Sequence, residues 1–302
     1  MKMKLPPCNA FHTLWTKPVT TAGKPFEMSA AEILTMIVSA LMWRKHNGSI
    51  RLYTDNAGYE FVSNHQLNEL WDGGINTDVL ENNSYPIDPE VFWAAGKLIA
   101  LEATTAPCVM LDTDLIVIKS ITHLLGQGPI VVLHHEELSP DVYLPAHLLK
   151  KPVGYNFPDH YNWGILPANT AFLYIQDAAF KEYYLEESKR FIFGNTEKPA
   201  EMVSQMVFAE QRLLAICANR WGITVNQLLS APFSISNDLI IHLWGFKATL
   251  QKSRNLQAIF SKQLFSTLAG ELSTYPIFRN YIEAHYPDFL LAGNRLVNEK
   301  MT

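Results

Sequence analysis

The sequence is poor in cysteine, contains no long hydrophobic run and carries no excess of positive charge. Its three cysteines, Cys8, Cys108 and Cys217, lie far apart and form no Cys-x-x-Cys pair. This pattern excludes a disulfide framework and a zinc knuckle, and it favours a reducing, cytoplasmic setting. The amino-terminal lysines are followed by no apolar segment, so we expect no signal peptide.

The most apolar helical window, residues 30–42, is too short to cross a bilayer and contains Glu32. We therefore expect no transmembrane segment, which leaves peripheral contact with a membrane open. The formal net charge of the 302-residue chain is −5. Because nucleic acid is held by a field of positive charge, we expect no nucleic acid partner.

Strands and helices alternate in the expected structure of the first third of the chain. Ser29 before Ala-Ala-Glu resembles a capping box, and Asp88-Pro89-Glu90 is typical of a helix start. The expected strands are 9–16, 50–54, 75–80 and 108–117, and the expected helices are 29–45, 59–70 and 88–104. This order predicts an α/β fold with a mostly parallel central sheet flanked by helices.

The alternation weakens after residue 128. Residues 139–159 are rich in proline and polar side chains, which predicts a loop-bearing insertion. The expected strands here are 129–134, 171–175 and 239–244, and the expected helices are 178–192, 202–218 and much of the chain from 248 onward. No repeat or long linker interrupts the sequence, so we predict one domain over residues 1–302.

Asp112 and Asp114 interrupt an apolar run that extends from Cys108 to Val117. A buried pair of carboxylates repels itself and loses hydration, so a divalent cation is its natural counter-ion. The alternative is a loop pair that caps backbone amides. Because several β-α units precede the pair, we expect it at the carboxyl end of a strand, where open α/β sheets bind ligands.

Four segments carry a more specific pattern, in this chain order: Lys97 to Val117 with Asp112-Thr-Asp114, Asn169-Thr-Ala-Phe-Leu-Tyr-Ile175, Glu210-Gln-Arg-Leu-Leu214 and His242-Leu-Trp-Gly-Phe-Lys247. Together they resemble the retaining GT-A glycosyltransferases of the glycogenin and lipopolysaccharide galactosyltransferase type, which are grouped as family 8. The resemblance implies a GT-A-like fold, with nucleotide binding in residues 1–128 and acceptor binding in residues 129–302.

The same resemblance implies a ligand set. Asp112 and Asp114, joined by His242, would hold Mn²⁺ or Mg²⁺, and an imidazole is compatible with a Mn²⁺ shell. Thr113 and Lys97 would contact the donor, a nucleoside diphosphate sugar and most simply a UDP-sugar. The acceptor would be a carbohydrate or glycolipid, and the sugar would be transferred with retention of its anomeric configuration.

Further positions follow from the resemblance. Glu210 and Gln211 match the family's Asp-Gln pair, although Glu210 is one methylene longer, and with Lys97 they are the expected catalytic residues. Gly245 would let the backbone approach the diphosphate, and Lys247 would supply a charge to it. Lys247 lies one residue earlier than in the family and no Pro-Trp follows it, which leaves its role open.

The expected nucleotide contacts lie at the carboxyl ends of the first two strands. Thr13 and Trp15 would frame the base, and Asp55 would accept a hydrogen bond from the base or the ribose. For each residue the alternative is an ordinary place in the core or in a turn.

Several features allow two interpretations. Either Asn162 or Asn169 lines the sugar pocket, and Ala171 replaces a family glycine. His134 and His135 are adjacent on an expected strand and point to opposite faces, so we interpret them as a strand end near the acceptor site rather than as one metal site. Aromatic side chains between residues 155 and 163 stack on sugars or anchor the loop.

Two other functions remain in competition with a transferase. A non-catalytic GT-A scaffold would bind sugar nucleotide or polysaccharide without turnover. A phosphatase of the haloacid dehalogenase type also uses Asp-x-Asp with Mg²⁺, but its motif lies close to the amino terminus, whereas three expected β-α units precede Asp112 here.

Overall fold

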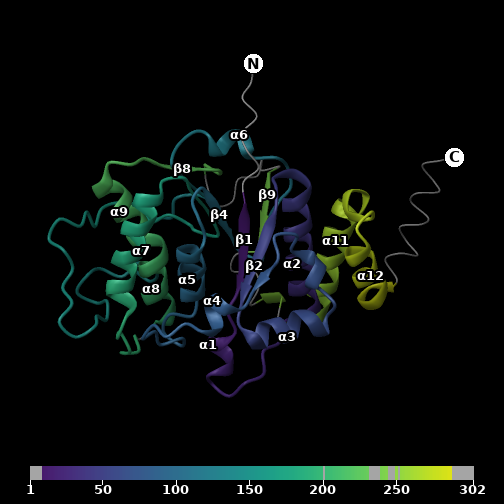
Figure 1. Cartoon of the computed structure of the whole chain (residues 1–302), viewed down its shortest axis with the longest axis horizontal. Coiled ribbons are helices and arrows are strands. Elements are labelled where there is room, and N and C mark those ends of the chain that lie inside the picture. The colour runs from purple at the N-terminus through teal and green to yellow at the C-terminus, as the bar shows by residue number, and fades with distance from the viewer. Residues whose placement is uncertain (1–8, 200, 231–238, 244–248, 251, 288–302) are drawn as a thin grey trace.

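The computed structural model describes residues 9–199, 201–230, 239–243, 249–250 and 252–287. Its main sheet contains β1 (Ala10–Leu14), β2 (Ile50–Thr54), β3 (Ile75–Asn76), β4 (Cys108–Leu111), β6 (Ile130–Val132), β7 (Phe172–Ile175) and β8 (Val225–Gln227). The strand order is β3-β2-β1-β4-β7-β6-β8 (Figure 1). A separate two-stranded sheet joins β5 (Leu115–Val117) to β9 (Ile240–His242).

The main sheet is mostly parallel. β1 pairs with β2 and β4 in parallel, and so do β2 with β3 and β6 with β8. Only β7 runs the other way, between β4 and β6. The predicted α/β class with a mostly parallel sheet is confirmed.

Helices cover both faces of this sheet (Figure 1). One face packs against α2 (Ala30–His46), which also contacts α11 (Arg254–Leu272) and α12 (Pro276–His285). The other packs against α5 (Ala95–Ala103), α7 (Ala178–Ile192) and α9 (Leu213–Trp221). Other helices among the described residues include α1 (Lys17–Thr20), α3 (Asn56–Asn64), the 3₁₀ turn Asn68–Leu70, α4 (Asp78–Glu81), α6 (Thr122–Leu125), α8 (Met202–Val207) and the π-helix Phe208–Arg212.

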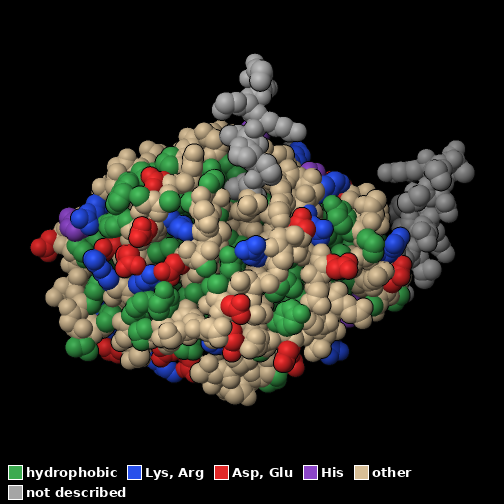
Figure 2. Space-filling model, viewed as in Figure 1, with side chains coloured by type: hydrophobic (Ala, Val, Ile, Leu, Met, Phe, Trp, Pro, Cys, Tyr) green, Lys and Arg blue, Asp and Glu red, His purple; other side chains and the backbone are tan. Residues whose placement is uncertain are grey.

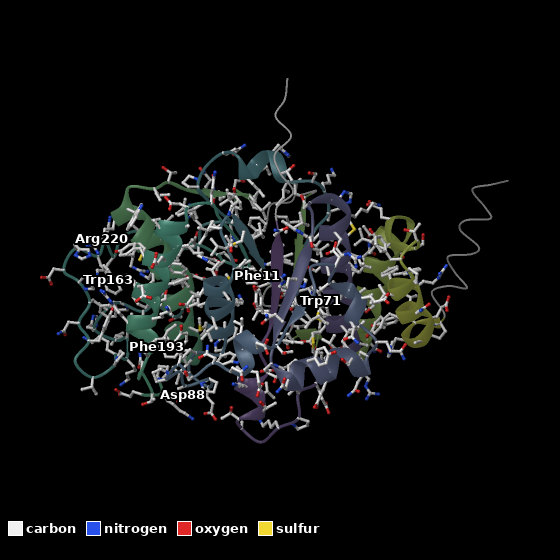
Figure 3. All side chains as sticks on the ribbon, viewed as in Figure 1. Phe11, Trp71, Asp88, Trp163, Phe193 and Arg220 are labelled. Carbon is white, nitrogen blue, oxygen red and sulfur yellow. The ribbon has the colours of Figure 1, made fainter. Side chains whose placement is uncertain are left out.

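The two cores follow from the side-chain pattern of the strands. Phe11 of β1 belongs to the core on the α5 side, whereas Trp71 belongs to the core on the α2 side, and the two are labelled on either side of the central strands in Figure 3.

Ser29 forms the predicted capping box with Glu32, and α2 is buried from Ile33 to Trp43. A helix buried nearly all round belongs inside the protein rather than on its surface.

The expected strand from Cys108 to Val117 is wrong as one element. β4 ends at Leu111, a turn follows, and β5 leaves the main sheet to pair with β9. The turn is closed by the amide of Leu115, which donates to the carbonyl of Asp112 at 3.1 Å. Asp112 and Asp114 therefore lie in the bend between two sheets.

Two other boundaries are also wrong. The expected strand 75–80 ends after Asn76, because the Asn76 side chain accepts a hydrogen bond from the amide of Val79 and α4 begins. Asp88 does accept from the amide of Glu90, as an N-cap would, but α5 begins only at Ala95. The intervening residues form turns, and two of their side chains, Val91 and Phe92, enter the core.

The remaining expectations differ from the structure mainly in their ends. The ranges 50–54 and 178–192 match β2 and α7, while 59–70 becomes α3 followed by the 3₁₀ turn. The range 202–218 becomes α8, the π-helix and α9, and β8 was not expected.

Figure 2 shows acidic and basic side chains interspersed over one face of the molecule. Among the described residues, no helix is long and apolar enough to cross a bilayer.

Candidate metal and donor site

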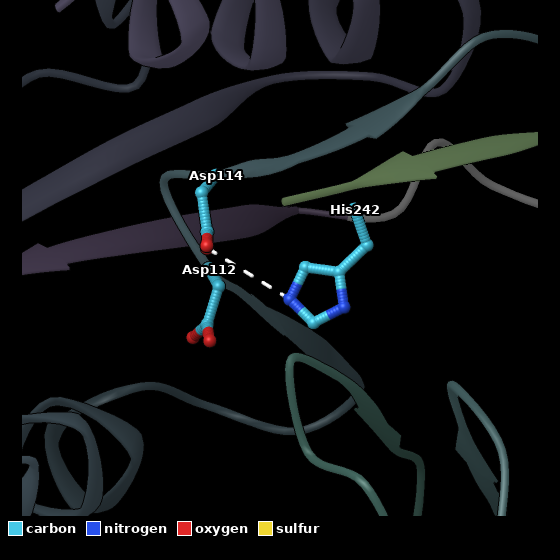
Figure 4. A group of neighbouring side chains, drawn as sticks. All are labelled: Asp112, Asp114 and His242. Atoms are coloured by element: carbon cyan, nitrogen blue, oxygen red, sulfur yellow. Dashed lines mark ion pairs between the residues drawn. The ribbon is translucent and has the colours of Figure 1, made fainter. Parts of the chain in front are cut away.

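Asp112, Asp114 and His242 converge at the bend between β4 and β5 (Figure 4). One ligand atom from each residue lies within 4.8 Å of the other two, and His242 Nε2 is 4.0 Å from Asp114 Oδ1. Ligands of an octahedral ion are bound at about 2.1 Å, so ion binding would draw these atoms inward. Two carboxylates and an imidazole form a donor set that suits a divalent metal ion.

Strand pairing brings the distant histidine to this bend. β9 runs antiparallel to β5 with His242 opposite Leu115, the residue directly after Asp114. The amide of Leu243 also donates to the carbonyl of Asp114 at 3.3 Å. The predicted triad of metal ligands is thus assembled in space, although ion binding itself stays a prediction.

A buried relay of hydrogen bonds holds β5 in place. Trp71 Nε1 donates to His12 Nδ1 at 3.2 Å, so the His12 proton is on Nε2, which lies 3.1 Å from Ser39 Oγ. Ser39 Oγ in turn donates to the carbonyl of Leu115 at 2.5 Å. Burial lowers the pKa of His12 to about 3, against a smaller opposing effect of Asp114. The imidazole is therefore neutral.

Lys97 on α5 is the positive charge next to the aspartates. Its Nζ lies 2.6 Å from Asp112 Oδ1 and 2.9 Å from Glu210 Oε1. Burial alone would lower the pKa of Lys97, but the two carboxylates raise it above its ordinary value. The ammonium is therefore permanently charged, and it holds two of the predicted site residues together.

Negative charge still exceeds positive charge here. Burial raises the pKa of Asp112 to about 6, the neighbouring Asp114 and Glu210 raise it too, and Lys97 lowers it. Asp112 and Glu210 share the ammonium of Lys97, and Asp114 adds a third carboxylate beside Asp112. A second cation would relieve the repulsion between them.

Glu210 lies on the π-helix, which is a rare element that often marks functional sites. Its side chain is almost fully buried, and Oε1 accepts from Thr170 Oγ1 at 2.7 Å as well as from Lys97. Tyr184 fixes the backbone by donating to the Glu210 carbonyl at 2.6 Å. Next to it, Gln211 accepts a hydrogen bond from Tyr143.

Asp55 has a complete set of protein partners. It is 1% exposed and caps α3, accepting from the amide of Gly58 at 3.0 Å and from the amide of Lys17 at 3.2 Å. Thr16 donates twice, from its amide and its hydroxyl, both at 2.8 Å. The Asp55 carboxylate organises the edge of the sheet, and its contact with a nucleotide stays a prediction.

Thr13 and Trp15 lie at the same edge, partly buried. Thr13 Oγ1 and Trp15 Nε1 have no hydrogen-bond partner among the described residues. The indole packs on α5 at Gly96, where a Cβ atom would lie 2.6 Å from Trp15 Cβ. Glycine is thus required for this contact, which places Trp15 beside the residue that precedes Lys97.

Asn169 and Asn162 differ sharply in their surroundings. Asn169 is buried, donates to Glu136 Oε1 at 2.7 Å and directly precedes Thr170, the partner of Glu210. Asn162 is exposed, and its side-chain oxygen accepts a hydrogen bond from the amide of Gly164. Of the two, Asn169 adjoins the described cluster.

His134 and His135 do not share a site. His134 is buried 3.3 Å from Glu136 Oε1, and burial lowers its pKa. His135 lies 3.2 Å, through Nε2, from the carbonyl of Val225. The interpretation of a strand end agrees with this separation.

The aromatic side chains between residues 155 and 163, at the end of the insertion and just after it, anchor this part of the chain to the helices. Phe157 stacks on Phe191 of α7 and Trp163 stacks on Phe208 of the π-helix. Tyr161 donates to the buried Glu187 at 2.6 Å. Of the two interpretations, these contacts support loop anchoring.

Gly245 and Lys247 lie outside the described residues. Thr113 occupies the turn between the two aspartates. The sequence did not predict a role for Thr170 or Tyr143. Thr170 bonds Glu210, 40 residues away in the chain, and Tyr143 bonds Gln211, 68 residues away.

A model of a family of unknown function, DUF6734, matches residues 9–262. The chain belongs to this family. No curated protein matches the sequence.

Several solved structures are similar to this chain. One is mouse xyloside xylosyltransferase 1 in its apo form, which is 12% identical and has a TM-score of 0.37. The match covers 73% of this chain and 84% of that chain. Galactosyltransferase LgtC in complex with donor and acceptor sugar analogs matches with 16% identity, 72% of each chain covered and a TM-score of 0.35. 4-Diphosphocytidyl-2C-methyl-D-erythritol synthase from Anaerococcus prevotii has 12% identity, 76% of this chain and 93% of that chain covered, and a TM-score of 0.35.

Proposed function

We propose that this protein is a metal-dependent glycosyltransferase that uses a nucleoside diphosphate sugar, most simply a UDP-sugar, as its donor. The observation that carries the proposal is the convergence of Asp112, Asp114 and His242 at the bend after a central strand. Such a cluster suits a divalent ion, Mn²⁺ or Mg²⁺, that is shared with a diphosphate. Residues 1–128 would bind the nucleotide and residues 129–302 the acceptor, a carbohydrate or glycolipid.

The reaction breaks the bond between the anomeric carbon and the diphosphate oxygen. The anomeric carbon then bonds to an acceptor hydroxyl on the same face, and the hydroxyl proton passes to the departing phosphate. The metal ion, when bound, stabilises the negative charge of the leaving diphosphate. This stabilisation matters because the sugar is oxocarbenium-like in the transition state.

The chain's own residues have distinct proposed roles. Lys97 is charged and reaches the edge of the metal cluster, so it would orient the donor and oppose the diphosphate charge. Glu210, held by Lys97 and Thr170, would accept a hydrogen bond from a hydroxyl of the transferred sugar. The unpaired polar atoms of Thr13 and Trp15 would bind the nucleotide base.

Nucleotide and metal titrations test this proposal. The thermal stability of the protein is measured with UDP and other nucleoside diphosphates, with and without Mn²⁺. Ligand at 100 times its Kd stabilises a native state by about 2.7 kcal/mol, so we expect stabilisation by nucleotide that increases with metal. If no nucleotide has a metal-dependent effect, the proposal is wrong.

Two sets of substitutions sharpen the titration. Asp112→Asn with Asp114→Asn should remove the metal effect. Asp141→Asn with Asp159→Asn removes the same charge from two exposed positions and should retain it. Donor binding without turnover would identify a non-catalytic scaffold, and phosphate release from a simple phosphoester would identify a phosphatase.

A further inference from the structure

Tyr143 reaches the π-helix from the insertion and contacts Gln211. Its hydroxyl lies 2.5 Å from Gln211 Oε1, and the side chain is buried, with 8% of the residue exposed. Distances this short are typical of O–H···O bonds, whereas N–H···O bonds lie nearer to 2.9 Å. The amide oxygen of Gln211, not its nitrogen, therefore faces the phenol.

The phenol can only act as the donor in this bond. Burial raises the pKa of Tyr143, the carboxylates of Glu136 and Glu210 raise it further, and Arg212 opposes them weakly. The hydroxyl thus keeps its proton and donates it to the side-chain oxygen of Gln211. No described residue accepts a hydrogen bond from the Gln211 amide nitrogen, and the side chain is partly exposed.

The insertion is fastened to the π-helix next to this contact as well. Arg212 donates to the carbonyl of Trp163 and lies over its ring, 5.5 Å from the centroid. The amide of Ala168 donates to the backbone carbonyl of Gln211 at 3.3 Å. The chain that follows Tyr143 is thus fixed to the same π-helix, at Gln211 and at the neighbouring Arg212.

We propose that Tyr143 is a positioning residue that turns the Gln211 side chain so that its N–H group faces the substrate. A neutral N–H donor binds an oxygen lone pair, and in the proposed reaction that oxygen would be a hydroxyl or ring oxygen of a sugar. The identity of this ligand rests on the proposed function, because Gln211 adjoins Glu210 and the Lys97 ion pair. The orientation of the amide does not depend on that function.

A double-mutant cycle tests the role in turnover. Tyr143→Phe keeps the ring and removes the hydroxyl, and we expect kcat/KM for the nucleotide sugar to fall about tenfold because the amide loses its orientation. In a Gln211→Ala background the same change should have no further effect, since Tyr143 acts through Gln211. An equal loss in both backgrounds, or no loss in either, would overturn the proposal.

An NMR measurement tests the orientation without any turnover. In protein labelled with ¹³C and ¹⁵N at glutamine, Tyr143→Phe should shift the Gln211 carboxamide carbon, and both side-chain N–H protons should exchange rapidly with water. A protected N–H proton that Tyr143→Phe releases would show the opposite orientation and refute the inference. Tyr161→Phe is the matched control, because Tyr161 is a buried phenol just after the insertion that bonds Glu187 instead.

The two experiments separate the possible failures. The expected NMR result in a protein that turns over no nucleotide sugar would reject the proposed function and retain the positioning role of Tyr143. If the protein turns over a nucleotide sugar but the effects of Tyr143→Phe and Gln211→Ala simply add, the proposed function stands and the positioning role of Tyr143 is rejected. Thermal stability of each variant shows whether it is folded.

Discussion

Asp55 and the Asp112–Asp114 pair follow the two strands that flank β1, yet the protein surrounds them differently. Asp55 accepts four hydrogen bonds from backbone amides and a hydroxyl. Asp112 faces Lys97 but also two other carboxylates, Asp114 and Glu210. One carboxylate is fully satisfied by the fold, whereas the other group retains excess negative charge.

This difference teaches how to distinguish structural from functional acids. A carboxylate whose oxygens are filled by amide donors stabilises the fold and needs nothing else. A cluster of carboxylates beside a histidine opposes folding until a cation joins it. Each substitution below is chosen to break or sharpen this contrast.

The largest effect is expected at the aspartate pair. Asp112→Asn with Asp114→Asn should reduce metal-dependent donor turnover at least about a thousandfold, which corresponds to about 4 kcal/mol of transition-state stabilisation. Without metal, the variant loses the Lys97–Asp112 ion pair but is also relieved of charge repulsion, so its free energy of unfolding should change less than that of Asp55→Asn. Steady-state kinetics and urea unfolding measure the two quantities. Retained turnover would contradict the role of the pair.

Unlike the substitutions at the aspartate pair, Asp55→Asn should act mainly by lowering the free energy of unfolding. Its amide nitrogen replaces an oxygen that accepts hydrogen bonds, so buried donors of Thr16 and Lys17 lose their partner. We expect the free energy of unfolding to fall by about 3 kcal/mol, from the lost cap and the unsatisfied donors. Urea unfolding at pH 7.5 measures this loss. An unfolding curve that matches the wild type would remove the contrast between the two sites.

Lys97→Met tests whether a metal ion can replace the Lys97 ammonium as the cation that stabilises Asp112 and Glu210. Without metal, Asp112 and Glu210 lose their shared cation, and we expect a loss of about 2 kcal/mol in stability. Saturating Mn²⁺ should recover much of this loss in Lys97→Met and none of the loss in Asp55→Asn. Thermal unfolding of both variants with and without Mn²⁺ provides the comparison. Equal responses of the two variants would argue against a metal at this cluster.

The smallest effect concerns His12 on β1, the strand between the two sites. Its pKa is lowered to about 3 in the folded protein, so the unfolded chain takes up a proton first as the pH falls. Stability is therefore lost below pH 6.5, by about 1.4 kcal/mol per pH unit. The stability difference between wild type and His12→Gln should narrow from pH 7.5 to pH 5. A constant difference would show that the pKa of His12 is the same in the folded and the unfolded protein.

Local sequence signals predicted much of the scaffold. Ser29 and Glu32 formed the expected capping box, and the ranges of β2 and α7 were predicted without error. The Asp112–Asp114 pair stood out because charged residues interrupt an apolar run. These features depend on residues close together in the chain, which a single sequence displays.

Long-range contacts set the limit of such prediction. The pairing of β5 with β9, the Tyr143 contact with Gln211 and the Thr170 contact with Glu210 have no local signature. Asp88 shows the converse, since its N-cap hydrogen bond forms while the helix begins only at Ala95. Burial of Val91 and Phe92 overrode the local preference there.

Direct Mn²⁺ binding is the measurement that tests the central claim most simply. Metal-free protein is titrated with Mn²⁺, and the electron paramagnetic resonance signal of the free ion is followed. We predict one saturable site in the wild type and in Asp141→Asn with Asp159→Asn, and no such site in Asp112→Asn with Asp114→Asn. Equal binding by all three proteins, or none by the wild type, would contradict the metal cluster at Asp112, Asp114 and His242.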